Sequence, residues 1–136
     1  MAGMLYLVPT PIGNLGDISK RARETLESAD FIAAEDTRVT LKLLNHLELK
    51  KPLVSYYEHN KSFKGEKILD RILEGETCAL VSDAGSPAIS APGEDLVKQC
   101  AAAGIPVCAI PGPCAAITAL SISAQSTGRF CFEGFL

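Results

Sequence analysis

Three apolar, strand-like segments of this chain each run into a loop of glycine, proline and small polar residues, and a helix-like pattern follows each loop. The segments are residues 5–10, 78–81 and 107–110. In an open parallel α/β sheet, ligands bind in the crevice beyond the carboxyl ends of the strands, and loops without bulky side chains let the backbone approach a ligand closely. One such loop also fits a simple tight turn. Three of them predict a small-molecule site at one edge of a sheet.

Strand-like and helix-like segments alternate along the chain. Strands are expected at residues 4–10, 31–34, 53–56, 77–82 and 107–110. The spacing of apolar residues predicts helices near residues 19–28, 39–47, 62–73, 93–103 and 114–123. Such alternation with short connections is typical of parallel strands joined by right-handed crossovers. We therefore predict an α/β fold with an open, mainly parallel five-stranded sheet and helices on both faces.

The composition narrows the class of protein. The 136 residues are enough for one ordinary domain, and no apolar run approaches the roughly 20 residues that span a bilayer. The five cysteines form no Cys-X-X-Cys pair, which favours reduced thiols in a cytoplasmic protein over a disulfide framework or a zinc site. The net charge is −3, with +1 on residues 1–71 and −4 on the rest. This is not the basic footprint of a stand-alone nucleic-acid binder.

Several sequence blocks are more specific together than any loop is alone. The longest, residues 5–18, reads Leu-Tyr-Leu-Val-Pro-Thr-Pro-Ile-Gly-Asn-Leu-Gly-Asp-Ile; its glycines match neither the dinucleotide fingerprint nor the P-loop. The others are Ala-Ala-Glu-Asp-Thr-Arg at 33–38, Lys-Leu-Leu-Asn-His at 42–46, Tyr-Glu-His-Asn at 57–60, Ala-Leu-Val-Ser-Asp-Ala-Gly at 79–85, Pro-Gly-Pro at 111–113 and Phe-Glu-Gly-Phe-Leu at 132–136. Together they resemble the tetrapyrrole methylase superfamily of S-adenosylmethionine-dependent methyltransferases, and within it the small-subunit rRNA methyltransferases.

The resemblance implies transfer of a methyl group from S-adenosylmethionine to the ribose 2′-hydroxyl of a cytidine in 16S rRNA of the small ribosomal subunit. It implies a cytoplasmic homodimer that needs no metal and no membrane. Members are about twice this length and hold the cofactor between two α/β domains. Residues 1–128 are therefore expected to form the N-terminal methylase domain, and 129–136 the start of a connection to a second domain. The last apolar run, residues 130–136, looks like a strand entering that connection.

By position, the resemblance assigns seven residues to cofactor binding. They come from the three loops described above: Pro11, Ile12, Gly13, Asp83, Ile89, Cys114 and Ala115. The chain departs from the family pattern at Ala91, where an aspartate is usual, and at Cys114, where a serine is usual. A thiol is a weaker hydrogen-bonding group than a hydroxyl, so Cys114 loosens a cofactor contact unless the backbone does the binding.

The transfer also calls for a base, because a ribose hydroxyl is a poor nucleophile until it loses its proton. Polar residues that follow the strands at 31–34 and 53–56 are the candidates. We expect Asp36 or Glu35 to act as the base. Arg38 is expected to anchor a phosphate through two hydrogen bonds, and His59 with Asn60 to orient the ribose.

Each of these residues has a second interpretation. Glu35, Asp36 and Thr37 also form a helix-capping sequence, and a histidine in a loop is often an ordinary surface residue. Alternation places one of Tyr56 and Tyr57 in the core and leaves the other able to stack on a base. The basic residues of the helix at 19–28 suit a solvated face or a contact with rRNA.

Two other functions fit parts of the pattern. One is C-methylation of a corrin or porphyrin precursor, against which the Ala-Glu-Asp-Thr-Arg block argues. The other is a non-catalytic module that binds an adenosine compound.

Overall fold

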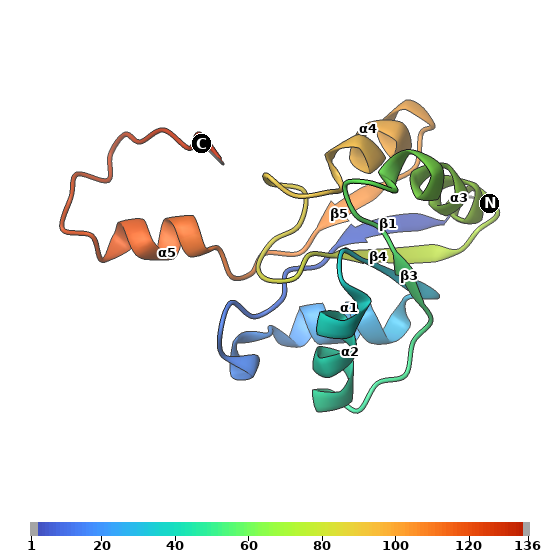
Figure 1. Ribbon diagram of the computed structural model, residues 1–136, viewed down its shortest axis with the longest axis horizontal. Coiled ribbons are helices and arrows are strands. Elements are labelled where there is room, and N and C mark those ends of the chain that lie inside the picture. The colour runs from blue at the N-terminus through green and yellow to red at the C-terminus, as the bar shows by residue number, and fades with distance from the viewer. Residues whose placement is uncertain (1–2, 135–136) are drawn as a thin grey trace.

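In the computed structural model, which describes residues 3–134, five strands form one sheet in the order β3-β2-β4-β1-β5 (Figure 1). They are β1 (Met4–Leu7), β2 (Phe31–Ala34), β3 (Leu53–Ser55), β4 (Thr77–Val81) and β5 (Val107–Ala109). All four strand pairings are parallel, which confirms the predicted α/β sheet. Because β1 lies between β4 and β5, the three glycine- and proline-containing loops leave neighbouring strands at the same edge.

The helices cover both faces of this sheet. They are α1 (Lys20–Ser28), α2 (Thr37–His46), α3 (Lys61–Leu73), α4 (Glu94–Ala102) and α5 (Ala115–Ser121), with a short 3-10 helix, η1 (Leu15–Asp17). Figure 1 shows α1 and α2 on one face and α3 and α4 on the other. Two separate apolar cores match this arrangement, one built on Leu26 and Leu44 and the other on Ile72 and Leu96.

The pleat of β2 shows how the sequence divides between the two cores. All four of its residues are buried. Ile32 and Ala34 pack in the core with α1 and α2, whereas Phe31 and Ala33 pack in the core with α3 and α4. Alternate side chains of a strand point to opposite faces, so a strand covered on both faces must be apolar throughout. The same alternation of side chains explains why Tyr56 is buried whereas Tyr57 is 40% exposed.

Most elements differ from the expected ranges by one to three residues at their ends, and two differences concern the elements themselves. β1 ends at Leu7 and is therefore shorter than predicted, and η1 follows where only a loop was expected. The expectation of a strand at 130–136 is wrong for residues 130–134, which have no regular structure; Phe135 and Leu136 lie outside the described residues. A strand requires a pairing partner, and among residues 3–134 none pairs with this segment, whose Phe130 and Phe132 are exposed.

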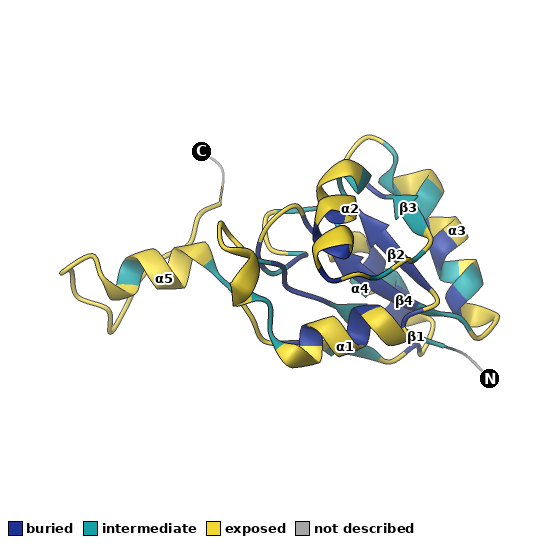
Figure 2. Ribbon diagram, turned by 90° about the horizontal axis from the view of Figure 1, so that it is seen from below, coloured by how far each residue is buried: buried dark blue, intermediate teal, exposed yellow. Residues whose placement is uncertain are grey.

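The helix α5 stands apart from both layers. It projects away from the sheet and contains no buried residue (Figure 1 and Figure 2). Within the described part of the chain, no helix has the length and apolar character needed to cross a membrane.

Candidate functional site

Backbone hydrogen bonds join the loops that follow β1 and β4. Thr10 N donates to Gly85 O over 3.1 Å, and Gly85 N donates back to Thr10 O over 2.9 Å. The Ser82 hydroxyl adds a bond to Gly85 O at 3.2 Å. Gly85 has φ +79°, a left-handed conformation that favours glycine, and a Cβ there would lie 3.3 Å from Ile12 Cγ2. The two loops therefore form a single unit.

The loop after β5 packs onto the same unit. Gly112 lies against Pro9 so closely that a Cβ at this position would overlap the proline ring. The Ser86 hydroxyl is within 3.5 Å of Pro113 O, which links the loop after β4 to the loop after β5. All three loops singled out in the sequence are thus in contact at the carboxyl edge of the sheet.

Between these loops and α5 lies a groove of about 480 Å³, here called the small-residue groove. Ile12, Ile89, Cys114 and Ala115 line it, so four of the seven predicted cofactor residues come together, joined by Gly85. Ligand pockets have volumes of about 300–1,000 Å³ and apolar walls with a few polar groups. The groove fits a nucleoside-type ligand on both counts. Its walls combine the small residues of the loops with large apolar side chains, namely Ile12, Ile89, Ile117, Phe130 and Phe132, and the Ser86 hydroxyl and the Cys114 thiol are among its lining groups.

The remaining predicted cofactor residues lie elsewhere. Pro11 and Asp83 line a second cavity of about 250 Å³ beside α2, together with Val39 and Lys42. Gly13 is exposed, with φ +146°, and lines neither cavity. The structure therefore places Pro11, Gly13 and Asp83 outside the groove that gathers the other four predicted residues.

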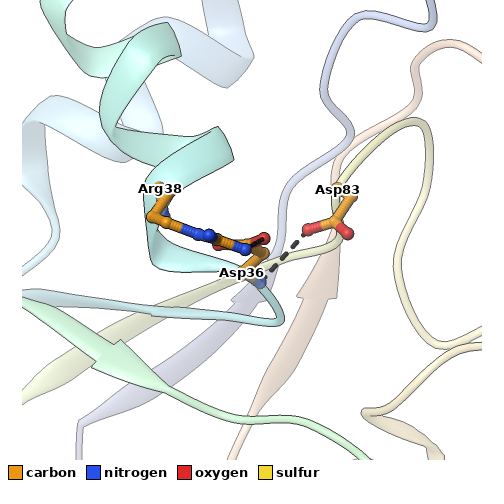
Figure 3. A network of polar contacts seen from close by, with 3 residues as sticks. All are labelled: Asp36, Arg38 and Asp83. Carbon is orange, nitrogen blue, oxygen red and sulfur yellow. Dashed lines mark hydrogen bonds and ion pairs between the residues drawn. The ribbon is translucent and has the colours of Figure 1, made fainter.

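Asp83 instead contacts the turn that follows β2 (Figure 3). Its Oδ1 accepts a hydrogen bond from Asp36 N at 3.1 Å, across 47 positions of sequence. The Asp36 carboxylate caps α2 by accepting from Arg38 N at 3.0 Å, which confirms the capping interpretation of this residue. It also pairs with the Arg38 guanidinium, whose Nη2 lies 2.9 Å from Asp36 Oδ2. Three residues from the predicted site thus form one polar network.

The two candidate bases differ in their electrostatics. Hydrogen bonds and the positive charge of Arg38 hold the pKa of the Asp36 carboxyl below its usual value. Partial burial raises the pKa of the Glu35 carboxyl, and the negative charges of Asp83 and Asp36 raise it further. A base that works near neutral pH needs a pKa closer to neutrality than that of an ordinary carboxylate. Glu35 has the shift that favours this role, and Asp36 does not.

Glu35 lines a hollow of about 580 Å³ at the ends of α3 and α4, here called the polar hollow. Lys61 lies in its wall and bridges two carboxylates, Glu58 and Asp95, each at 3.0 Å. These two partners hold the pKa of the Lys61 ammonium well above its usual value. Sequence reasoning missed Lys61 and Asp95, because the elements that bring them together are distant in the chain.

The loop after β3 places the last two predicted residues. Asn60 uses its side chain within the loop: Oδ1 accepts from Tyr57 N at 2.7 Å, and Nδ2 donates to Ser55 O at 3.1 Å. His59 is exposed, and its ring meets the edge of Tyr57 with the centroids 6.4 Å apart. Asn60 therefore shapes this loop, whereas the His59 imidazole faces solvent.

The family of this chain follows from its sequence as a whole. The model for tetrapyrrole (corrin/porphyrin) methylases matches residues 4–130. The chain belongs to this family. Among curated relatives, it is 54% identical over 134 residues to ribosomal RNA small subunit methyltransferase I of Escherichia coli O157:H7. It is 58% identical over 134 residues to the protein of the same name from Halalkalibacterium halodurans.

The chain spans about half the length of these methylase relatives: 98% of it aligns, with 47% of the first and 46% of the second. The solved structures that resemble the chain are also about twice its length. A conserved hypothetical protein from Aeropyrum pernix K1 matches 96% of this chain and 46% of its own, with a TM-score of 0.76 at 21% identity. Uroporphyrin-III-C-methyltransferase from Thermus thermophilus matches 89% and 52%, with a TM-score of 0.67 at 25% identity. Both share the fold of this methylase chain.

Proposed function

We propose that this chain is the N-terminal domain, residues 1–128, of an enzyme that methylates the ribose 2′-hydroxyl of a cytidine in 16S rRNA. The observation that carries the proposal is identity of 54% and 58%, over 98% of the chain, to proteins named ribosomal RNA small subunit methyltransferase I. Because those relatives are about twice as long, residues 129–136 would lead into a second domain. The substrate would be the small ribosomal subunit, and the enzyme a cytoplasmic homodimer.

The small-residue groove is the proposed place for S-adenosylmethionine. Ile12 and Ile89 would contact its apolar parts, and Cys114 and Ala115 would approach it from the start of α5. When bound, it supplies a methyl group, whose carbon forms a bond to the ribose oxygen while its bond to sulfur breaks and the electron pair stays on sulfur. Pro11 and Gly13 would shape the loop beside the groove without lining it. Three loops joined by hydrogen bonds and packing fix the loop side of this site before the ligand arrives, which lowers the cost of binding.

The turn at residues 35–38 is the proposed acceptor side. Glu35 would take the proton that leaves the ribose hydroxyl, since its environment favours proton uptake. Arg38 would contact an RNA phosphate, because its side chain is 87% exposed. Its two hydrogen bonds to Asp36 use only part of the guanidinium, and the other N–H groups can bind an anion. His59 would orient the ribose from the loop after β3, whose shape Asn60 maintains.

The test is methyl transfer by the full-length protein. Small subunits prepared without this modification are incubated with labelled S-adenosylmethionine, and the rRNA is digested to nucleosides. The expected product is 2′-O-methylcytidine at one position. Label on a porphyrin precursor instead of RNA would assign a C-methyltransferase. Binding of S-adenosylhomocysteine without transfer to either acceptor would assign a binding module and contradict the proposal.

A further inference from the structure

We propose that Asp83 is a positioning residue: it ties the turn that carries Glu35 to the loop that forms the small-residue groove, so that the proton acceptor is held in register with the methyl donor. The inference rests on the proposed function, and it gives Asp83 a role other than contact with the cofactor. Three observations carry it: the position of its hydrogen bond, its place in the loop, and its charge.

The hydrogen bond reaches the backbone that carries Glu35. Asp83 Oδ1 accepts from Asp36 N at 3.1 Å, and that N–H belongs to the peptide that joins Glu35 to Asp36. In Figure 3 the Asp83 side chain extends from the loop after β4 toward the start of α2. The bond therefore anchors the backbone N–H of the peptide next to Glu35 to the Asp83 carboxylate.

The position of Asp83 in its loop makes the connection short. The next three residues, 84–86, all line the small-residue groove, whereas Asp83 itself does not. Gly85 is fixed in turn by its two backbone bonds to Thr10. Asp83 thus connects the wall of the small-residue groove to the turn that carries Glu35. Displacement of a reacting group by about 1 Å can cost about 10²-fold in rate, so such a link matters for catalysis.

The charge of Asp83 acts on the same group. After burial, Asp83 is the largest influence that raises the pKa of Glu35, ahead of Asp36. The polar hollow brings further charged residues around Glu35 from other elements, namely Glu58, Lys61, Glu94, Asp95 and Glu133. Lys61 is paired with Glu58 and Asp95, so two of these carboxylates are partly neutralised. Asp83 therefore supports Glu35 in two ways, by a hydrogen bond to its backbone and by a negative charge near its carboxyl.

Two substitutions separate these effects. Asp83→Asn keeps an oxygen that can accept from Asp36 N but removes the charge, whereas Asp83→Ala removes both. Glu66→Gln, at an exposed position on α3, is the matched control for loss of one negative charge. In the 136-residue chain, NMR measures exchange of the Asp36 amide with water and the titration of the Glu35 carboxyl. We expect faster amide exchange in Asp83→Ala only, and a lower pKa of Glu35 in both variants but not in the control.

In the full-length protein, the acid limb of the kcat–pH profile is expected to move to lower pH in Asp83→Asn, because Glu35 then deprotonates more readily. Asp83→Ala is expected to lose about 10–100-fold in kcat through misplacement. The dissociation constant of S-adenosylhomocysteine should stay within a factor of two of wild type in both.

Two results would overturn the inference. One is an unchanged exchange rate of the Asp36 amide in a folded Asp83→Ala variant, and the other is an unchanged pKa of Glu35 in Asp83→Asn. A more than tenfold loss of S-adenosylhomocysteine affinity in both variants would also overturn it, because that would make Asp83 a cofactor ligand. Failure of the proposed function looks different: the wild-type protein then transfers no methyl group to small subunits, while the NMR results on the chain stand independently.

Discussion

The Asp36 carboxylate holds the Arg38 guanidinium flat against it, with Oδ1 3.1 Å from Nε and Oδ2 2.9 Å from Nη2. A carboxylate with two hydrogen bonds to a cation is a weak proton acceptor, and its lowered pKa agrees with this. The pair instead presents an oriented, exposed guanidinium at the edge of the proposed site. The carboxyl of Asp36 thus has a lowered pKa and that of Glu35, its neighbour in the turn, a raised one.

The first prediction compares those two residues. Glu35→Gln should lower kcat for methyl transfer by about 10²–10⁴-fold, the contribution of a positioned general base. Asp36→Asn should have a smaller effect on kcat and raise KM for the small subunit, because asparagine still caps α2 but no longer holds Arg38. Single-turnover and steady-state assays on small subunits measure both. Equal losses of kcat in the two variants would contradict this division of roles.

The second prediction concerns the packing of the three loops. Gly112→Ala should lower the free energy of unfolding by about 1–3 kcal/mol, because the new methyl group overlaps Pro9 and forces the loops apart. Urea denaturation of the chain measures the change. Gly128→Ala is the control: no atom lies within 4 Å of the added Cβ, so its stability should stay within about 0.5 kcal/mol of wild type.

The third prediction tests the departure at Cys114. This residue is the N-cap that precedes α5; its backbone is extended, and its side chain makes no capping hydrogen bond. Cys114→Ser adds a hydroxyl at the groove, worth about 1 kcal/mol or roughly fivefold in affinity if the ligand uses it. Calorimetry with S-adenosylhomocysteine and the full-length protein is the measurement. Cys131→Ser, at an exposed position outside the groove, should leave the affinity unchanged.

The fourth prediction separates two neighbours in the loop after β3. Asn60→Ala should destabilise the chain by about 1 kcal/mol, since the backbone groups of Ser55 and Tyr57 lose their side-chain partner. His59→Ala should leave stability unchanged but lower kcat, if the imidazole orients the ribose. Thermal unfolding and the transfer assay together distinguish the two. A His59→Ala variant with the wild-type rate would make this histidine an ordinary surface residue.

The fifth prediction follows from an ion pair outside the site. Arg71 lies 2.7 Å from Glu76 at Nε and Oε2, and this bond lowers the pKa of the Glu76 carboxyl. A carboxyl with a lowered folded-state pKa stabilises the protein above its unfolded-state pKa, and this contribution disappears as the pH falls through the folded-state pKa. The melting temperature of Glu76→Gln should thus lie below wild type at pH 7 and converge with it in acid. Glu74→Gln, exposed nearby, should show no such convergence.

The regular elements were largely predictable, because apolar periodicity and alternation are local properties of the sequence. The strands expected at residues 31–34 and 77–82 are recognisable from their apolar composition, and the structure confirms them at 31–34 and 77–81. The capping role of Asp36 was also visible locally, as one of two interpretations. The strand expected at 130–136 was wrong over its described part, because a β-prone composition does not supply a pairing partner.

The site was predictable only where residues are adjacent in sequence or belong to a known motif. Ile12, Ile89, Cys114 and Ala115 were placed by resemblance and do share one groove. The bond from Asp36 N to Asp83 was not predictable, since it depends on how β2 and β4 pair side by side. The same holds for the bridge that Lys61 makes to Asp95, which needs α3 and α4 to meet at their ends.

The order of strands in the sheet has a consequence for how such an enzyme diversifies. The loops that line the small-residue groove leave β1, β4 and β5, whereas the proposed acceptor residues follow β2 and β3. Under the proposed function, the donor and acceptor residues would therefore lie on opposite halves of one sheet, joined by the hydrogen bond from Asp36 N to Asp83. Under the proposed function, insertions or substitutions after β2 and β3 would change the methylated molecule while the donor half stays intact. Related methylases with unlike substrates would then differ most on the β2–β3 side.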